Sequence, residues 1–210
     1  PRINGVIYNL SWEFTMIENP ELLEAAVEAA EMKKKISKIE QLNFGNQQKA
    51  GLILVLLGEK PAVEVALYDW NDPPGKFAEV IKEIGLNFEE LNFEDRAFTS
   101  PKLVTRFAIA RDKETVLSLR SLDPARDHRE YGLLMGYPES AVEAFVKSKE
   151  IKQTRQKDGG PTWKLIKDRS VVNFALSKDN WQDEIKTSER WNEVLRKYAP
   201  ELYKKIQGVK

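Results

Sequence analysis

The chain has 210 residues with 33 basic and 33 acidic side chains, so its formal net charge at neutral pH is zero. A neutral chain has no global field that attracts nucleic acid or an anionic membrane, although a local basic patch can still form. The sequence contains no cysteine, which excludes disulfides, thiolate metal sites and cysteine nucleophiles. With 41% hydrophobic and 31% charged residues, the composition is that of a globular chain.

The apolar segments are too short for a membrane span, and the N-terminus lacks the basic and apolar regions of a signal peptide. We therefore expect a cytoplasmic protein without membrane contact. The high share of Glu and Lys is typical of proteins from heat-loving sources.

The N-terminal third begins with a helix signal, since Asn19 can cap a helix and Pro20 suits its first position. The apolar residues that then recur at helical spacing are Leu22, Leu23, Ala26, Val27 and Ala30. Further on, the continuous apolar run at residues 52–57 is typical of a strand buried on both faces. Residues 58–61 predict a turn, and residues 63–68 predict the second strand of a hairpin.

The central part of the chain carries one more strand and two short helices. Residues 77–84 predict a helix that stops at a glycine, and residues 86–91 fit either a short strand or a turn. Residues 103–110 alternate as a strand. Asp112 is expected to cap a helix that runs to about Ser121.

Residues 126–146 are the most informative stretch, because the only histidine, two glycines and a Tyr-Pro step lie within it. They predict a helix at residues 129–135, a corner at Gly136 and a second helix that starts at Pro138. Gly136 is expected to take a positive φ angle that ends the first helix. An alternative reading of the corner is an anion site at the N-terminus of the second helix, with Ser140 as a donor.

The C-terminal part begins with a polar, glycine-containing stretch at residues 151–161, which indicates a mobile loop. Residues 163–166 and 170–176 predict two strands. The last long helix is expected to be capped by Thr187 or Ser188. Its stripe of large side chains comprises Trp191, Val194, Leu195 and Tyr198.

These elements predict a single α+β domain over residues 1–210, with a mixed or antiparallel sheet covered by helices and a C-terminal docking helix. Phe145 and Trp191 are predicted core residues, because each has apolar neighbours three and four positions away.

The run from His128 to Phe145 resembles the signature of an archaeal protein family of unknown function. The matching positions are His128, Arg129, Glu130, Gly132, Leu134, Gly136, Tyr137, Pro138, Val142 and Phe145. Ser140 and Ala141 stand where that family carries a cysteine pair, so a metal or redox role of the pair cannot operate here. The resemblance implies an archaeal source but no activity.

The candidate catalytic residues are those around the histidine, namely Asp127, His128, Glu130 and Tyr137. His128 can act as a general base oriented by Asp127 or Glu130, or it can simply cap or pack at a helix start. The sequence shows no metal-ligand spacing, phosphate loop or dinucleotide motif, so we expect no metal and no cofactor.

A basic cluster follows the second helix of this stretch. Its candidate nucleic-acid-binding residues are Lys149, Lys152, Arg155 and Trp163, because an aromatic ring among cations can stack on a base. The alternative is a solvated helix end. The leading hypothesis is a non-enzymatic binding or accessory protein with a nucleic-acid or protein partner. The alternative hypothesis is a small enzyme that uses the polar site around His128 and Tyr137.

Overall fold

The computed structural model describes residues 2–3, 6–7, 20–68, 70–91, 103–147 and 174–208. Its contacts divide the chain into two compact units, residues 1–37 and residues 38–210. The first unit contains the antiparallel strands β1 (Arg2–Ile3) and β2 (Val6–Ile7) and most of helix α2 (Pro20–Gln41). This helix begins at the predicted proline. The organisation of the chain as a single domain stays a prediction.

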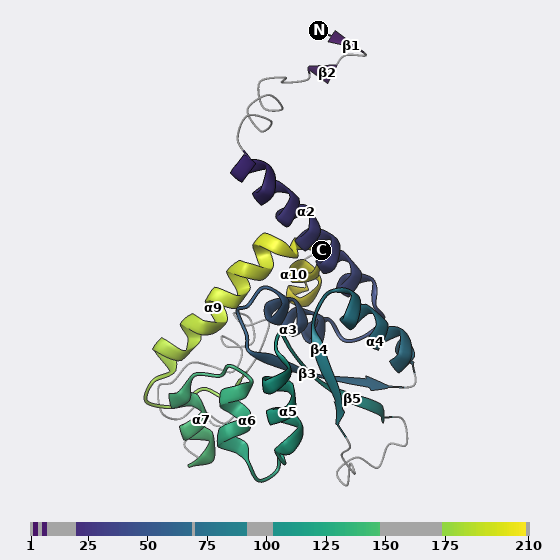
Figure 1. Cartoon of the computed structure of the whole chain (residues 1–210). Helices are drawn as coiled ribbons and strands as arrows, with labels where there is room; N and C mark the ends of the chain where they lie inside the picture. The colour runs from purple at the N-terminus through teal and green to yellow at the C-terminus, as the bar shows by residue number, and fades with distance from the viewer. Residues whose placement is uncertain are drawn as a thin grey trace. The chain divides into compact units, whose positions relative to one another are not determined.

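The second unit is built around a three-stranded antiparallel sheet with the strand order β3–β5–β4 (Figure 1). β3 (Ala62–Tyr68) and β4 (Asn87–Leu91) lie on either side of the central strand β5 (Leu103–Ala110). Helices pack on this sheet, so the predicted α+β class with an antiparallel sheet covered by helices is confirmed.

Both faces of the sheet are covered, which explains why the consecutive residues 107–110 of β5 are all buried. On one face, Ala108 and Ala110 pack with residues of α5 (Lys113–Ser121). On the opposite face, Phe107 contacts Phe77 of α4 (Pro74–Glu83), with 5.2 Å between the ring centroids. Alternate residues of a strand point to opposite faces, so the two layers share a single central strand.

The apolar run at residues 52–57 forms a helix, and the predicted hairpin is therefore wrong. Helix α3 (Asn46–Leu56) is buried from Lys49 to Leu56 and packs against β3. A helix that is buried on all sides and a buried strand give the same continuous apolar run, so the sequence period does not distinguish them. Gly51 allows the close contact with β3, because a Cβ atom there would lie 2.8 Å from Val63 Cγ2.

Four helices complete the described part of this unit: α6 (His128–Leu134), α7 (Glu139–Val146), α9 (Trp181–Tyr198) and α10 (Pro200–Gln207). Helix α9 begins well before the predicted cap at Thr187 or Ser188, so that boundary is wrong. Its first turn contains Asp183 and Glu184, which the positive end of a helix favours. Helix α10 packs against α3 and α9, which confirms the C-terminal docking helix.

Residues 174–176 form no strand. The other residues of the two predicted C-terminal strands lie outside the described residues, as does the predicted loop at residues 151–161. Within the described ranges, no helix combines the length and apolar character needed to cross a membrane.

Candidate functional site

The corner between α6 and α7 has the geometry that the sequence predicts. Gly136 has a φ angle of 75°, and its N–H donates to the carbonyl oxygen of Leu133 at 2.9 Å. A Cβ atom at Gly136 would lie 2.6 Å from Pro61 Cδ. Both the positive φ angle and this steric contact therefore disfavour any residue other than glycine here. The two helices approach closely at Gly132, where a Cβ atom would lie 2.8 Å from Val142 Cγ2. The corner therefore fixes α6 and α7 side by side.

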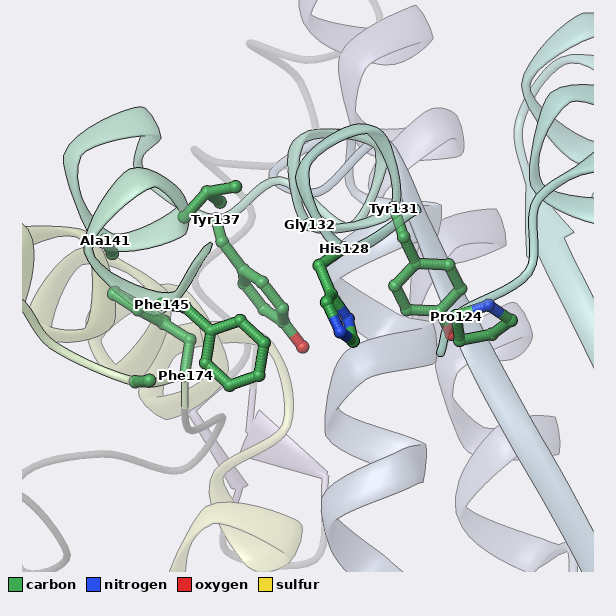
Figure 2. Close-up of a pocket in the computed structure, with 10 residues that line it drawn as sticks. Pro124, His128, Tyr131, Gly132, Tyr137, Ala141, Phe145 and Phe174 are labelled. Carbon is green, nitrogen blue, oxygen red and sulfur yellow. The ribbon is translucent and has the colours of Figure 1, made fainter. Parts of the chain in front are cut away.

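A pocket of about 300 Å³ opens between these helices and the segment that precedes α9 (Figure 2). Its lining residues are Pro124, His128, Tyr131, Gly132, Tyr137, Ala141, Val142, Phe145, Phe174 and Ala175. Five of these side chains are aromatic and none carries a carboxylate, an ammonium or a guanidinium group. The imidazole of His128 and the hydroxyl of Tyr137 both point into the space between α6 and α7 (Figure 2).

A buried lysine lies against the ring of Tyr137, one of the residues that line the pocket. Lys60 is 2% exposed, and its Nζ lies 4.9 Å from the ring centroid of Tyr137 and 4.6 Å from that of Trp191. Phe174 stacks on Tyr137 and meets Trp191 edge to face, so the three rings and the lysine form one cluster. Burial lowers the pKa of Lys60 to about 7, whereas the two ring faces favour its charged form.

Tyr131, which also lines the pocket, is hydrogen-bonded to a carboxylate of the sheet. Its hydroxyl donates to Oε2 of Glu64 on β3, and Arg106 of β5 forms an ion pair with the other carboxylate oxygen of Glu64 at 3.4 Å. Burial and the neighbouring Glu64 carboxylate raise the pKa of Tyr131. Burial also raises the pKa of Tyr137, with a smaller contribution from Glu64. Both phenols are therefore protonated at neutral pH and can donate hydrogen bonds.

The four candidate catalytic residues separate into two pairs. His128 and Tyr137 line the pocket, whereas Asp127 and Glu130 do not. The Asp127 carboxylate instead accepts a hydrogen bond from the backbone N–H of Asp123 at 2.7 Å. Glu130 is exposed on α6. The carboxylates expected to orient the histidine therefore do not share its pocket.

The predicted core position of Phe145 is wrong, since its side chain is 47% exposed. Helix α7 buries Ala141, Val142 and Ala144, and Phe145 lies at the edge of that face, against the pocket. Its ring contacts His128 edge to face, with 5.3 Å between the centroids. The prediction for Trp191 is confirmed, because its side chain is fully buried.

Ser140 has a different role from that of the predicted anion donor. Its Oγ donates to Oε1 of Glu184 at 2.6 Å, and the other carboxylate oxygen accepts from the Ser177 N–H at 2.7 Å. Glu184 is 2% exposed and links α7 to α9. An anion at the start of α7 would lie near this carboxylate, which disfavours the predicted anion site. Ala141, at the other position of the cysteine pair, is buried against the pocket.

The candidate nucleic-acid-binding residues Lys149, Lys152, Arg155 and Trp163 lie outside the described residues. Lys147 is the first lysine of the basic cluster and lies within the described residues. It forms an ion pair with Glu143 at 2.8 Å. Arg129 also binds Glu143 and, at 2.8 Å, Glu139. Arg129 of α6 and Lys147, which follows α7, thus both pair with carboxylates of α7.

Sequence reasoning missed Lys60 and Phe174 as parts of the site. Lys60 lies between Glu59 and Pro61 in the Gly58–Pro61 segment, a pattern that predicts an exposed turn residue. Tyr137 and Trp191 of α9 pack against it, and the sequence carries no local signal of those contacts. Within the described ranges, no group of three or more His, Asp or Glu residues is arranged to hold a metal ion.

No protein-family model, curated protein or solved structure shows a significant match to the chain. The geometry and chemistry of the pocket therefore carry the functional inference.

Proposed function

We propose that this is a binding protein that seats an aromatic side chain of a protein partner in the pocket between α6 and α7. The proposal depends on one observation: half of the residues that line a cavity of about 300 Å³ are aromatic, and none carries a carboxylate, an ammonium or a guanidinium group. Cavities of this size accept small ligands or single side chains. Aromatic side chains that fill such pockets supply much of the binding energy of protein interfaces.

The rim of the pocket favours a protein partner. Phe145 and Val146 on α7 are both 47% exposed, and exposed apolar residues beside a cavity are typical of protein-binding surfaces. Within the apolar walls, the Tyr137 phenol can donate a hydrogen bond and the His128 imidazole can donate or accept one. A tyrosine or tryptophan of the partner fits both features, because its ring is apolar and its edge carries one polar hydrogen.

The other two hypotheses have less support from this pocket. Nucleic-acid binding requires cations that neutralise phosphates, and the lining contains no Lys or Arg. The alternative enzyme draws support from His128 and Tyr137, which share the cavity. A general base is usually oriented by a third group, and neither Asp127 nor Glu130 lines the pocket with His128.

The proposal is tested with side-chain analogues as probes. Ligand-observed NMR should detect p-cresol and indole bound with a Kd of about 1 mM, as expected for fragments of this size. The variant Phe145→Ala should weaken both probes about tenfold without unfolding the protein, because its side chain is half exposed. Leu117→Ala on α5 is the matched control, since Leu117 is 44% exposed and lies outside the pocket lining.

If the occupant of the pocket is a side chain of a protein partner, we expect a further result. Random peptides selected on the wild-type protein should be enriched in Tyr or Trp, and p-cresol should displace them. Tighter binding of phenyl phosphate than of p-cresol would contradict an uncharged occupant and favour the nucleic-acid hypothesis. Equal binding of p-cresol by the wild type and Phe145→Ala would place its binding site elsewhere.

A further inference from the structure

The N-terminal half of α2 presents an exposed apolar row. Leu23 and Val27 are 50% and 51% exposed, and Ala30 continues the row at the i, i+4, i+7 spacing of one helix face. The neighbouring Leu22 is 48% exposed. Scattered single apolar residues are ordinary on a surface, but a periodic row on one helix is typical of a face that packs against another helix.

The charges of α2 are divided into two blocks along its length. Residues 21–31 contain four glutamates and no basic residue, whereas residues 33–38 contain four lysines and no acidic residue. The helix dipole explains charges in the first and last turns only, so it does not explain the positions of Glu28, Glu31 and Lys33 in the middle of the helix. Within one helix, Glu24 and Glu28 are like charges four residues apart, which is unfavourable.

The glutamates of the acidic block also flank the apolar row. Glu24, Glu28 and Glu31 each follow a row residue by one position, so they lie along its side as charged residues do beside a helix–helix seam. In an antiparallel pair of identical helices, the acidic block of one copy lies against the basic block of the other. In a parallel pair, like charges would face each other.

We propose that α2 pairs in an antiparallel manner with α2 of a second copy of this chain, with the two-fold axis near Ala30. Such a contact is self-complementary, which is the arrangement of a two-fold symmetric dimer. It covers the apolar row with residues 30–37 of the partner's α2 and brings Glu24 and Glu28 toward the lysines of that helix. It uses none of the residues that line the pocket, so this proposal is independent of the proposed function.

Analytical ultracentrifugation of the full chain tests the pairing. The wild type should be dimeric in the micromolar range, and both the Glu24→Lys, Glu28→Lys, Glu31→Lys variant and the Lys33→Glu, Lys34→Glu, Lys35→Glu variant should be monomeric. An equimolar mixture of the two variants should regain a dimer, because their blocks are complementary. The control Glu79→Lys, Glu90→Lys, Glu193→Lys changes the net charge equally on exposed residues elsewhere and should stay dimeric.

Single cysteines in this cysteine-free chain test the orientation. Ala30→Cys lies near the proposed axis and should form an intermolecular disulfide, whereas Leu23→Cys should not, because its two copies would lie too far apart. Disulfides in both variants would indicate a parallel pair and overturn the proposal. A monomeric wild type would also overturn it, as would a dimer that the charge reversals leave intact, which would have another interface.

Discussion

At the scale of single residues, Gly136 is the position at which backbone geometry most constrains the site. Gly136→Ala should lower the free energy of unfolding by about 1–3 kcal/mol, because φ is 75° and the new methyl group would meet Pro61. Gly75→Ala is the control: Gly75 lies in α4, and a Cβ atom there meets nothing within 4 Å. Urea unfolding should show the control unchanged or slightly stabilised. Equal effects of the two substitutions would contradict the claim.

The buried residue Lys60 is expected to make the stability of the folded protein depend on pH. Its pKa is about 7 in the folded protein, below the ordinary value of 10.5, so between these pH values the unfolded chain holds a proton that the folded chain has released. The contribution of Lys60 to the free energy of unfolding therefore rises with pH across that window and is lost as pH falls through about 7. Relative to the wild type, Lys60→Met should lose about 2–3 kcal/mol of stability as pH rises from about 6 to about 9.

Urea unfolding at several pH values measures this difference. Lys197→Met is the matched control, because Lys197 also lies over a tyrosine ring, at 4.9 Å, but is exposed. Its stability relative to the wild type should be constant with pH. A constant difference for Lys60→Met would mean that Lys60 keeps its proton and that the two rings compensate fully for its burial.

Local signals predicted some residues of the site and not others. Asp112 was predicted as a helix cap and accepts from the Thr115 N–H at 2.7 Å, and the φ angle of Gly136 follows from the helix end before it. Both features depend on a few consecutive residues. The burial of Lys60 and the exposure of Phe145 depend on contacts made by distant segments, which a helical or turn pattern does not contain.

At the scale of elements, the link between α7 and α9 holds one wall of the pocket. Glu184→Ala would leave the Ser140 hydroxyl and the Ser177 N–H without their acceptor and should cost about 2–4 kcal/mol. Glu184→Gln keeps an acceptor and a donor in the same place, so its cost should be smaller by about 1 kcal/mol or more. Thermal or urea unfolding decides between them. Equal costs would mean that the negative charge itself, rather than the hydrogen bonds, holds the link.

Elements with a clear periodic or terminal signal in the sequence were predicted well, and α3, which lacks one, was not. The alternation of residue types along β5 predicted its type and bounds, and the proline at position 20 predicted the start of α2. Helix α3 has no polar face from Lys49 to Leu56, so its helical period is invisible and the run was predicted as a strand. The length of an apolar run does not separate the two cases when it is this short.

At the scale of the whole molecule, charge is balanced in total but unevenly distributed along the chain. Residues 147–169 contain more lysine and arginine than aspartate and glutamate, whereas the described pocket contains no charge. These two parts of the chain differ in chemistry. The first suits phosphates and the second suits an uncharged ring, so one experiment can distinguish their contributions.

We expect binding of a single-stranded oligonucleotide to be weak and confined to low salt, because a neutral molecule offers only a local field, which is screened within roughly 8 Å at physiological ionic strength. The logarithm of affinity should fall with the logarithm of salt by about 0.7 per phosphate contact. Replacing Lys149, Lys152 and Arg155 by Gln should remove the gel shift, whereas Phe145→Ala should leave it unchanged. A shift that Phe145→Ala removes would place the nucleic acid in the pocket and contradict the aromatic side chain as its occupant. If no shift appears at low salt, the basic cluster is not a nucleic-acid surface, and the pocket and α2 are left as the two surfaces proposed to bind partners.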